Sequence, residues 1–518
     1  MNKIITLSTV AFLSTTLYAQ TDVEILQEQV RALMNKVAEL EQKQTAPITT
    51  KNSGEVDIKA LVTKVNKIEK KQVSQIKKLS KVKSLSAKDN LKFDVDFRTS
   101  YDNIQYTTAS GKKYKNDGLY SNRLWLGLGY APTDTMTFKG QLSYHKAFGA
   151  SSELQRGSEH GFDTFDWVTN ENLTNDSLKV REAYWLWTPT LGDFPLTISV
   201  GRRPATNGFL VNLRDDDKAK SPMGHLINME FDGASIGVKL DKYVPGMLAK
   251  LCIGRGLTNA NARFNQQGLD YAENGDNLDN VDLIGLIFKP YDDGQYSIMT
   301  KYYRGYHVPG MYATTIDGST GQPTEYSMQN GGDMDGAGIS VKIDGIGNEI
   351  SDFLDDTILF ASFAWSKSMP DEVTRNIINA GPYSGEMVDS SMLGSGEKQT
   401  GTSYWLGAQM PNLTGGRFGL EYNHGSKYWR AFTYGEDTMI GSKLAARGDA
   451  YEAYWTQPII DNTFSMQIRY TYIKYDYTGS NAFFGDAGTP MTMSEATDMG
   501  MDPVEKAQDL RVYFRYRY

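Results

Sequence analysis

Apolar and polar residues alternate along much of this chain, and this alternation limits its fold more than any other feature. In LKFDVDFRTSY, residues 91–101, the apolar residues Leu91, Phe93, Val95 and Phe97 alternate with the charged residues Lys92, Asp94, Asp96 and Arg98. A period of two is typical of a β-strand with two unlike faces. The pattern predicts sixteen strands: residues 91–101, 119–131, 134–147, 178–188, 194–203, 229–241, 247–257, 280–290, 295–305, 335–346, 355–367, 401–411, 415–425, 449–459, 462–476 and 508–518.

The connections between these segments alternate in length. Short ones carry turn residues, such as TPTLGD at 188–193 and KPYDDG at 289–294. The long ones are rich in Gly, Asp, Asn and Ser, and cover residues 102–118, 148–177, 204–228, 258–279, 306–334, 368–400, 426–448 and 477–507. A compact β-sandwich does not place a long loop after every second strand, whereas a transmembrane barrel with an even strand number does.

The two strand faces agree with a membrane barrel. One face repeats Leu, Phe, Ile and Val with aromatic ends, and the other repeats Asp, Arg, Ser, Gln and Gly. In a wide barrel, lipid covers the apolar face and water fills the lumen. Closure pairs every backbone amide, so we expect residues 508–518 to pair with residues 91–101. The predicted fold class is all-β: a transmembrane antiparallel barrel of about 16 strands, preceded by a short α-helical coiled-coil stalk.

The first residues indicate export. MNKIITLSTVAFLSTTLYAQ has Lys3, an apolar run and Ala19, which predicts a signal peptide over residues 1–19. The expected location is the outer membrane of a Gram-negative bacterium, with residues 91–518 as the barrel and residues 20–90 as a periplasmic stalk.

The expected stalk begins with a heptad pattern that predicts a homo-oligomer, either a dimer or a trimer. A lone helix that folds back on the barrel is the alternative. The second half of the stalk holds 11 Lys between residues 51 and 88, which favours a solvated helix face or contact with the anionic cell wall. Export argues against nucleic acid as a partner. The predicted oligomerisation residues are Val23, Leu26, Val30, Leu33, Val37 and Leu40.

Few residues offer chemistry for an enzyme or a cofactor. The single cysteine, Cys252, excludes an internal disulfide and a C-x-x-C-H haem attachment. The five histidines lack metal-ligand spacing, and the acidic runs at 275–282 and 331–336 match no complete Ca²⁺ loop. We therefore predict no enzyme activity, no cofactor and no metal.

Several stretches resemble Gram-negative outer-membrane porins with an N-terminal coiled coil. The terminal VYFRYRY is similar to the aromatic-ended signal that barrel-assembly machinery reads, and REAYWLWTP, ISVGRRPATNG and SPMGHLINMEFDGAS resemble a long-looped outer-membrane family of unestablished role. The resemblance implies a porin for passive diffusion of small hydrophilic solutes or ions. The alternatives are an envelope tether that acts through the Lys-rich stalk and a barrel sheath around a partner such as a cytochrome. The expected assembly signal is Val512, Phe514, Tyr516 and Tyr518.

Strand parity also selects charges for the inner face, where a mixed ring would sort solutes by polarity. Wall salt bridges are the alternative role. In KVREAYWLW, residues 179–187, the parity fails unless the strand has a bulge. The charged loop 204–228 is either a folded-in eyelet or an exposed tip. The predicted pore-lining residues are Asp94, Asp96, Arg98, Arg123, Arg203, Glu421, Glu452, Arg469, Arg511, Arg515 and Arg517.

Overall fold

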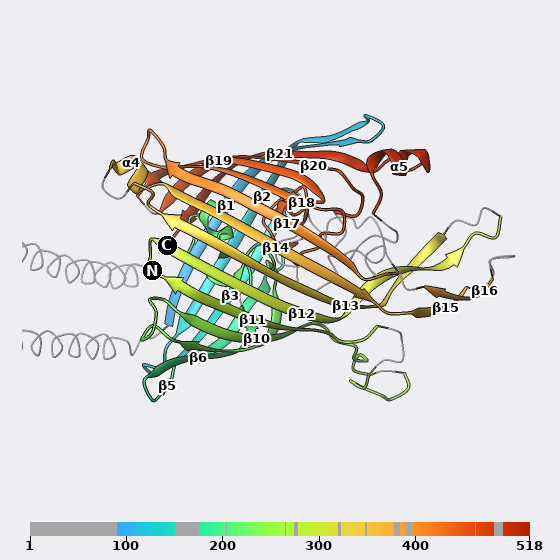
Figure 1. Ribbon diagram of the computed structural model, residues 1–518, viewed down its shortest axis with the longest axis horizontal. Helices are drawn as coiled ribbons and strands as arrows, with labels where there is room; N and C mark the ends of the chain where they lie inside the picture. The colour runs from blue at the N-terminus through green and yellow to red at the C-terminus, as the bar shows by residue number, and fades with distance from the viewer. Residues whose placement is uncertain are drawn as a thin grey trace, which may run out of the picture. The chain divides into compact units, whose positions relative to one another are not determined.

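Sixteen long strands form one closed antiparallel barrel (Figure 1). The computed structural model describes residues 91–150, 173, 176–203, 205–264, 266–273, 278–319, 323–347, 350–377, 384–389, 396–461, 463–480 and 490–518. The barrel strands are β1 (Leu91–Thr108), β2 (Lys113–Tyr130), β3 (Met136–Ala147), β4 (Lys179–Trp187), β6 (Phe194–Arg203), β9 (Phe231–Lys239), β10 (Leu248–Leu257), β11 (Val281–Asp292), β12 (Tyr296–Ile316), β13 (Pro323–Asp344), β14 (Ile358–Pro370), β17 (Gln399–Pro411), β18 (Arg417–Gly425), β19 (Gly448–Ile460), β20 (Phe464–Tyr475) and β21 (Val504–Arg517).

The barrel closes between its first and last strands. β1 pairs with both β2 and β21, and Val95 and Tyr518 exchange two backbone hydrogen bonds of 2.9 Å. This closure confirms the all-β, antiparallel-barrel part of the predicted fold class, and each of the sixteen predicted segments contains or overlaps one barrel strand. The signal peptide, the stalk and its six heptad residues lie outside the described residues, so those predictions remain predictions.

Two predicted loops were wrong in part. Residues 102–118 and 306–334 continue as paired strands, because β1 pairs with β2 as far as Thr107 and β12 pairs with β13 as far as Ile316. Their residues past the apolar segments no longer alternate, so periodicity alone could not show the extension. The loop after β14 also contains a hairpin of β15 (Val373–Ile377) and β16 (Gly385–Asp389).

Other connections contain short helices and the short strand β5. A turn between β13 and β14 holds α4 (Asp352–Asp355), and the loop before β21 holds α5 (Met493–Asp498). Thr492 and Glu495 form a capping box at the start of α5. The two-residue β5 (Thr190–Leu191) pairs with β6. In the described part of the chain, no helix has the length and apolar character needed to cross a bilayer.

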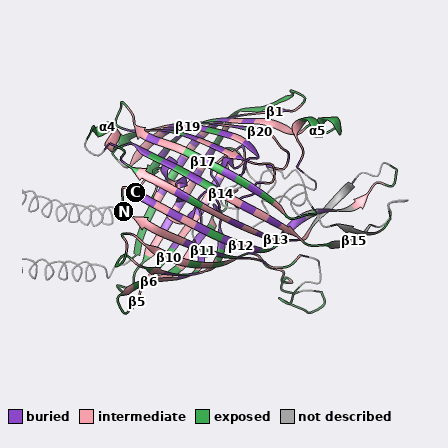
Figure 2. Cartoon of the chain, in the orientation of Figure 1, coloured by how far each residue is buried: buried purple, intermediate pink, exposed green. Residues whose placement is uncertain are grey.

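The outer face of the barrel is apolar. Exposed and buried residues alternate along the strands (Figure 2), and the exposed ones include Leu406, Leu420 and Phe514. Trp185 and Trp187 are exposed on β4, as expected for an aromatic girdle. Since the inner face of the same strands carries charged residues, the predicted separation of the two faces holds.

Two connections fold into the barrel. Loop A, residues 205–230, contains β7 (Gly208–Phe209), α3 (Val211–Arg214) and β8 (Lys220–Met223), and loop B, residues 426–447, contains η3 (Lys443–Ala445). The two loops join through backbone hydrogen bonds from Asn228 to Phe432 (2.7 Å) and from Phe432 to Leu226 (3.0 Å). Of the two alternatives for residues 204–228, the folded-in loop is therefore correct for the described part.

A hydrophobic core lies inside the barrel, which corrects the expectation of a wholly polar lumen. Loop A packs its apolar residues against the inner face of β11 to β17. The contact is close: a Cβ added to Gly338 on β13 would lie 2.6 Å from the Met223 side chain. The inner residues of this wall include Leu283, Ile287, Met299, Phe360 and Trp405.

Candidate functional site

The inner face of β1, β2, β20 and β21 carries a cluster of buried arginines. Each side chain is no more than 3% exposed. A guanidinium group in such a place is costly unless hydrogen-bonded acceptors and opposite charge surround it. The partners of these arginines therefore determine what the barrel interior can do. The members of this arginine cluster are Arg98, Arg123, Arg469, Arg511 and Arg515.

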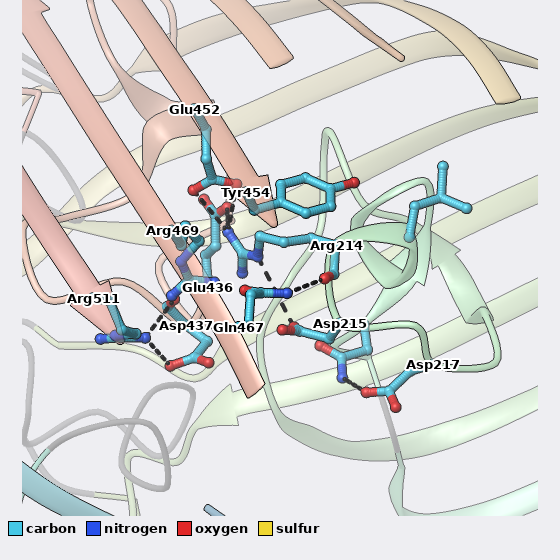
Figure 3. Close-up of polar contacts among 12 residues, drawn as sticks. Arg214, Asp215, Asp217, Glu436, Asp437, Glu452, Tyr454, Gln467, Arg469 and Arg511 are labelled. Atoms are coloured by element: carbon cyan, nitrogen blue, oxygen red, sulfur yellow. Dashed lines mark hydrogen bonds and ion pairs between the residues drawn. The ribbon is translucent and has the colours of Figure 1, made fainter. Parts of the chain in front are cut away.

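Asp437 of loop B is the central partner. Its carboxylate accepts hydrogen bonds from Arg98 (Nη2 to Oδ1, 2.9 Å), from Arg511 (Nη1 to Oδ1, 3.1 Å) and, more weakly, from Arg123 at 3.4 Å. Arg469 donates to the Asp437 backbone carbonyl at 2.8 Å. Figure 3 shows Asp437 beside Arg511 and Arg469. One loop residue thus connects four arginines on the wall.

The surroundings of Asp437 keep it ionised. Burial by itself would raise the pKa of this carboxyl, but the charges of Arg98 and Arg511 lower its pKa well below the ordinary value. The carboxylate is therefore a permanent counter-charge for the arginine cluster. Loop B remains attached to the wall by charge-assisted hydrogen bonds, which are the strong kind.

A second ion cluster joins both loops to β18 and β19. Arg214 of loop A contacts Glu436 of loop B at 3.1 Å and Glu452 of β19 at 3.3 Å (Figure 3). Lys443 of loop B pairs with Glu421 at 2.6 Å and also with Glu452. These side chains are nearly inaccessible, so solvent screens the pairs little.

Loop A contacts the last strand through its acidic residues. Arg515 donates from Nη2 to Asp217 at 3.0 Å, from Nη1 to the Asp215 carbonyl at 2.8 Å, and from Nε to Asp96 at 2.9 Å. Arg517 pairs with Asp217 at 3.1 Å. The acidic run of loop A is thus bound to β21.

Arg181 explains the failed parity of β4. The pairing with β3 shifts between Gln141 and Leu142, which leaves Arg181 as a bulge residue and confirms the expected irregularity. The bulge turns Arg181 inward, where its guanidinium lies 4.1 Å from the Trp125 ring and donates to Thr206 of loop A at 2.7 Å. Arg123 lies 3.5 Å from the same ring.

His225 holds the other end of loop A against the apolar wall. Its ring nitrogens hydrogen-bond the hydroxyls of Ser362 on β14 (2.8 Å) and Ser403 on β17 (2.9 Å). Burial lowers the pKa of His225 to about 3, so the imidazole is neutral near pH 7. His225 is fully buried, and it acts here as a structural anchor for loop A.

A cavity of about 430 Å³ lies at the end of the barrel where β1 begins and β21 ends. It contains acidic and basic side chains together with Trp125, so both signs of charge face one space. Among the described residues, no group of three or more His, Cys, Asp or Glu is arranged to hold a metal ion. Residues that line the cavity include Asp94, Asp96, Asp217, Lys218, Lys220 and Arg517.

All eleven predicted pore-lining residues lie on the inner face. The end cavity is lined by four of them: Asp94, Asp96, Arg515 and Arg517. Arg203 lies apart from the arginine cluster, near β10 and β12. The others are covered by loops A and B or paired beneath them. Their position matches the wall salt-bridge alternative, and a role in solute selection stays a prediction.

The sequence analysis missed the partners that loop B supplies: Glu436, Asp437 and Lys443. A signal was present in its composition, because loop B carries Trp429 and Phe432, both at most 1% exposed. Large apolar residues in a long loop indicate that the loop is buried.

A family model described as "Protein of unknown function (DUF3373)" matches residues 113–518. A search of curated proteins found no match. Among solved structures, Salmonella typhi OmpF in complex with daunomycin is 12% identical, with 83% of this chain and 99% of that chain covered and a TM-score of 0.41. Pseudomonas putida OprB at high pH is 11% identical, with 84% and 96% covered and a TM-score of 0.43. An anion-selective porin from Comamonas acidovorans is 10% identical, with 83% and 99% covered and a TM-score of 0.42. Because these scores are low, we assign the barrel from its own strand pairing.

Proposed function

We propose a function for this chain, which belongs to the DUF3373 family of proteins of unknown function, from the properties of its barrel. The chain is an outer-membrane channel of narrow bore, through which small hydrophilic solutes or ions diffuse passively. It catalyses no reaction, and flux follows the concentration gradient. The observation that carries this proposal is the closed sixteen-strand barrel with an apolar outer face and a charged inner face.

Loops A and B support a narrow bore. They lie across the inside of the barrel and pair with both walls, so a solute has to pass between loop and wall. At such a constriction, fixed charges select solutes by charge and hydration. The interior filled by these loops also leaves little room for a partner protein, which argues against the sheath alternative.

The membrane placement follows from the outer face. Lipid-facing Val512, Phe514 and Tyr516 of β21 alternate with inward Arg511 and Arg515, and we propose that this strand is also read by barrel-assembly machinery. The location is the outer membrane of a Gram-negative bacterium, where the protein is a dimer or a trimer with its stalk in the periplasm.

Assembly offers one test of this placement. A charge on the lipid face of a barrel strand is destabilising near the middle of the bilayer. Phe514→Asp is therefore expected to reduce the amount of folded barrel, measured as the heat-modifiable band on a gel of outer membranes. Lys115→Asp, on an exposed residue near the β1–β2 turn, is the control. Equal folding of the two variants would contradict the placement.

Planar-bilayer recording tests the channel itself. The purified full-length protein is expected to give discrete single-channel steps in KCl, and the heat-denatured protein none. Conductance should be small because loops A and B occupy the interior. A protein that folds and inserts, yet gives no steps in any salt, would overturn the proposed function.

A further inference from the structure

Three cationic side chains lie on the inner wall away from the arginine cluster. Lys250 on β10 and Lys301 on β12 both pair in register with Ile287 of β11, so their Cα atoms are about 10 Å apart on one face. Arg203 on β6 is near enough for its charge to act on both lysines. Arg203 and Lys301 are 7% and 8% exposed.

These three cations differ from the arginine cluster in what surrounds them. Within the described ranges, no carboxylate forms an ion pair with Arg203, Lys250 or Lys301, and the side chains near Lys301 include Lys250, Arg203 and Cys252. Lys250 donates to the Ser221 hydroxyl of loop A at 2.7 Å, and the buried Arg203 Nε has no hydrogen-bond acceptor. An anion placed among these side chains would stabilise their charged forms against burial and mutual repulsion.

Two glycines lie beside the lysines on neighbouring strands of the wall. Gly237 pairs with Lys250, and a Cβ there would lie 3.4 Å from the Lys250 Cγ and 2.7 Å from the Thr197 Oγ1. Gly285 lies between Cys252 and Tyr303 on the neighbouring strands, and its added Cβ would come within 3.9 Å of the Lys301 Cε. A side chain at position 237 would therefore collide with Thr197 beside the Lys250 stem, whereas one at position 285 would only touch Lys301.

We propose that Arg203, Lys250 and Lys301 bind a small inorganic anion, and that this site makes the channel prefer anions. The inference rests on the proposed channel function and names its solute class. Two ammonium groups and one guanidinium supply donors for a halide or an oxyanion, and the Ser221 hydroxyl adds one more polar group. The site lies between loop A and the wall of β6, β10 and β12, where a permeating anion would replace the missing carboxylates.

Reversal potentials in a KCl gradient test the preference. The wild-type channel is expected to pass chloride more readily than potassium, and Lys301→Gln is expected to lower the chloride-to-potassium permeability ratio about fivefold, as removal of one nearby charge would. Lys474→Gln is the matched control, because Lys474 is 46% exposed and pairs with Asp476. A cation-preferring wild type, or a ratio that Lys301→Gln leaves unchanged, would overturn the inference.

A binding measurement separates this inference from the channel proposal. Sodium phosphate, compared with sodium gluconate at equal ionic strength, is expected to raise the thermal unfolding midpoint of the detergent-solubilised full chain, since a ligand stabilises the state it binds. The rise should disappear in a Lys250→Gln, Lys301→Gln double variant. Stabilisation without conductance would leave the anion site standing and remove the channel function. Conductance without this stabilisation and without a chloride preference would leave the channel function standing and overturn the anion site.

Cys252→Ser examines the remaining source of negative charge. If a bound anion balances the three cations, this variant retains the chloride preference and the phosphate effect. If both effects are weak in the wild type and grow in Cys252→Ser, the Cys252 sulfur supplies the counter-charge and the anion site is wrong.

Discussion

On the inner face of β1, β2, β20 and β21, buried arginines meet carboxylates of the loops, whereas β11 to β17 meet loop A through apolar side chains and His225. In the first region, the carboxylate of Asp437 by itself contacts three guanidinium groups. In the second, Leu226 and Phe360 belong to one hydrophobic core. Loops A and B, which together form a plug inside the barrel, are therefore held by directional ion pairs on one side. On the other side they are held by non-directional apolar contact.

This difference matters for a channel. An ion-pair network has few alternative arrangements, so loss of one carboxylate leaves several buried charges without a partner. An apolar contact loses free energy in proportion to the atoms removed and relaxes in part. We expect loop B to detach after one substitution and loop A to loosen gradually.

Asp437→Asn is expected to have the largest effect. It removes the charge that Arg98, Arg123 and Arg511 share, and breaking a buried ion pair costs about 3–5 kcal/mol. Loop B should leave the wall, single-channel conductance should rise, and trypsin should cleave at Lys443. Asp117→Asn, in an exposed pair with Lys115, should change neither readout. Wild-type conductance and protection in Asp437→Asn would show that ion pairs do not hold loop B.

The sequence predicted the wall better than the plug, and the reason is physical. Strand faces follow from a period of two among neighbouring residues, so the inward direction of Arg98 and Arg511 could be derived locally. Their partner, Asp437, is 339 residues from Arg98. No local pattern encodes such a contact. The sequence therefore predicted an ordinary polar loop at loop B, although this loop contains Trp429 and Phe432.

The sequence predicted two other features only in part: the bulge at Arg181 and the position of the charged run of loop A. The sequence showed that parity failed in residues 179–187, but not which residue was extra. It also left loop A either inside or outside. The apolar residues after the charged run, such as Leu226 and Ile227, favour burial, because an exposed loop gains nothing from them.

Leu226→Ala tests the apolar side with a smaller expected effect. Leu226 is fully buried in loop A, and this truncation typically costs about 3 kcal/mol through lost transfer free energy and a residual cavity. The urea midpoint of the refolded barrel should fall. Unlike the effect of Asp437→Asn, this loss should be the same in low and high salt, since no charge is involved. Leu413→Ala, at a fully exposed turn residue, is the control. A strong salt dependence of the Leu226→Ala effect would contradict the division into two regions.

Acidification is expected to distinguish the ion-pair region from the apolar region through the smallest of the three changes in stability. The pKa of Asp437 is lowered, so its stabilisation is complete above the ordinary aspartate pKa of about 4 and is lost only below it. The pKa of His225 is lowered to about 3, so below about pH 6.5 the unfolded chain binds a proton that the folded chain does not. The contribution of His225 therefore lowers the free energy of unfolding by about 2 kcal/mol when the pH is lowered from 7 to 5.

The measurement compares urea midpoints of wild type and His225→Gln across this pH range. Glutamine retains a donor and an acceptor for Ser362 and Ser403 but does not titrate. The wild type should lose stability on acidification more steeply than His225→Gln, and the difference isolates His225 from every other titrating group. Parallel pH profiles would mean that His225 has the same pKa in the folded and the unfolded chain. The apolar region around His225 would then be no more sensitive to acid than the arginine cluster around Asp437.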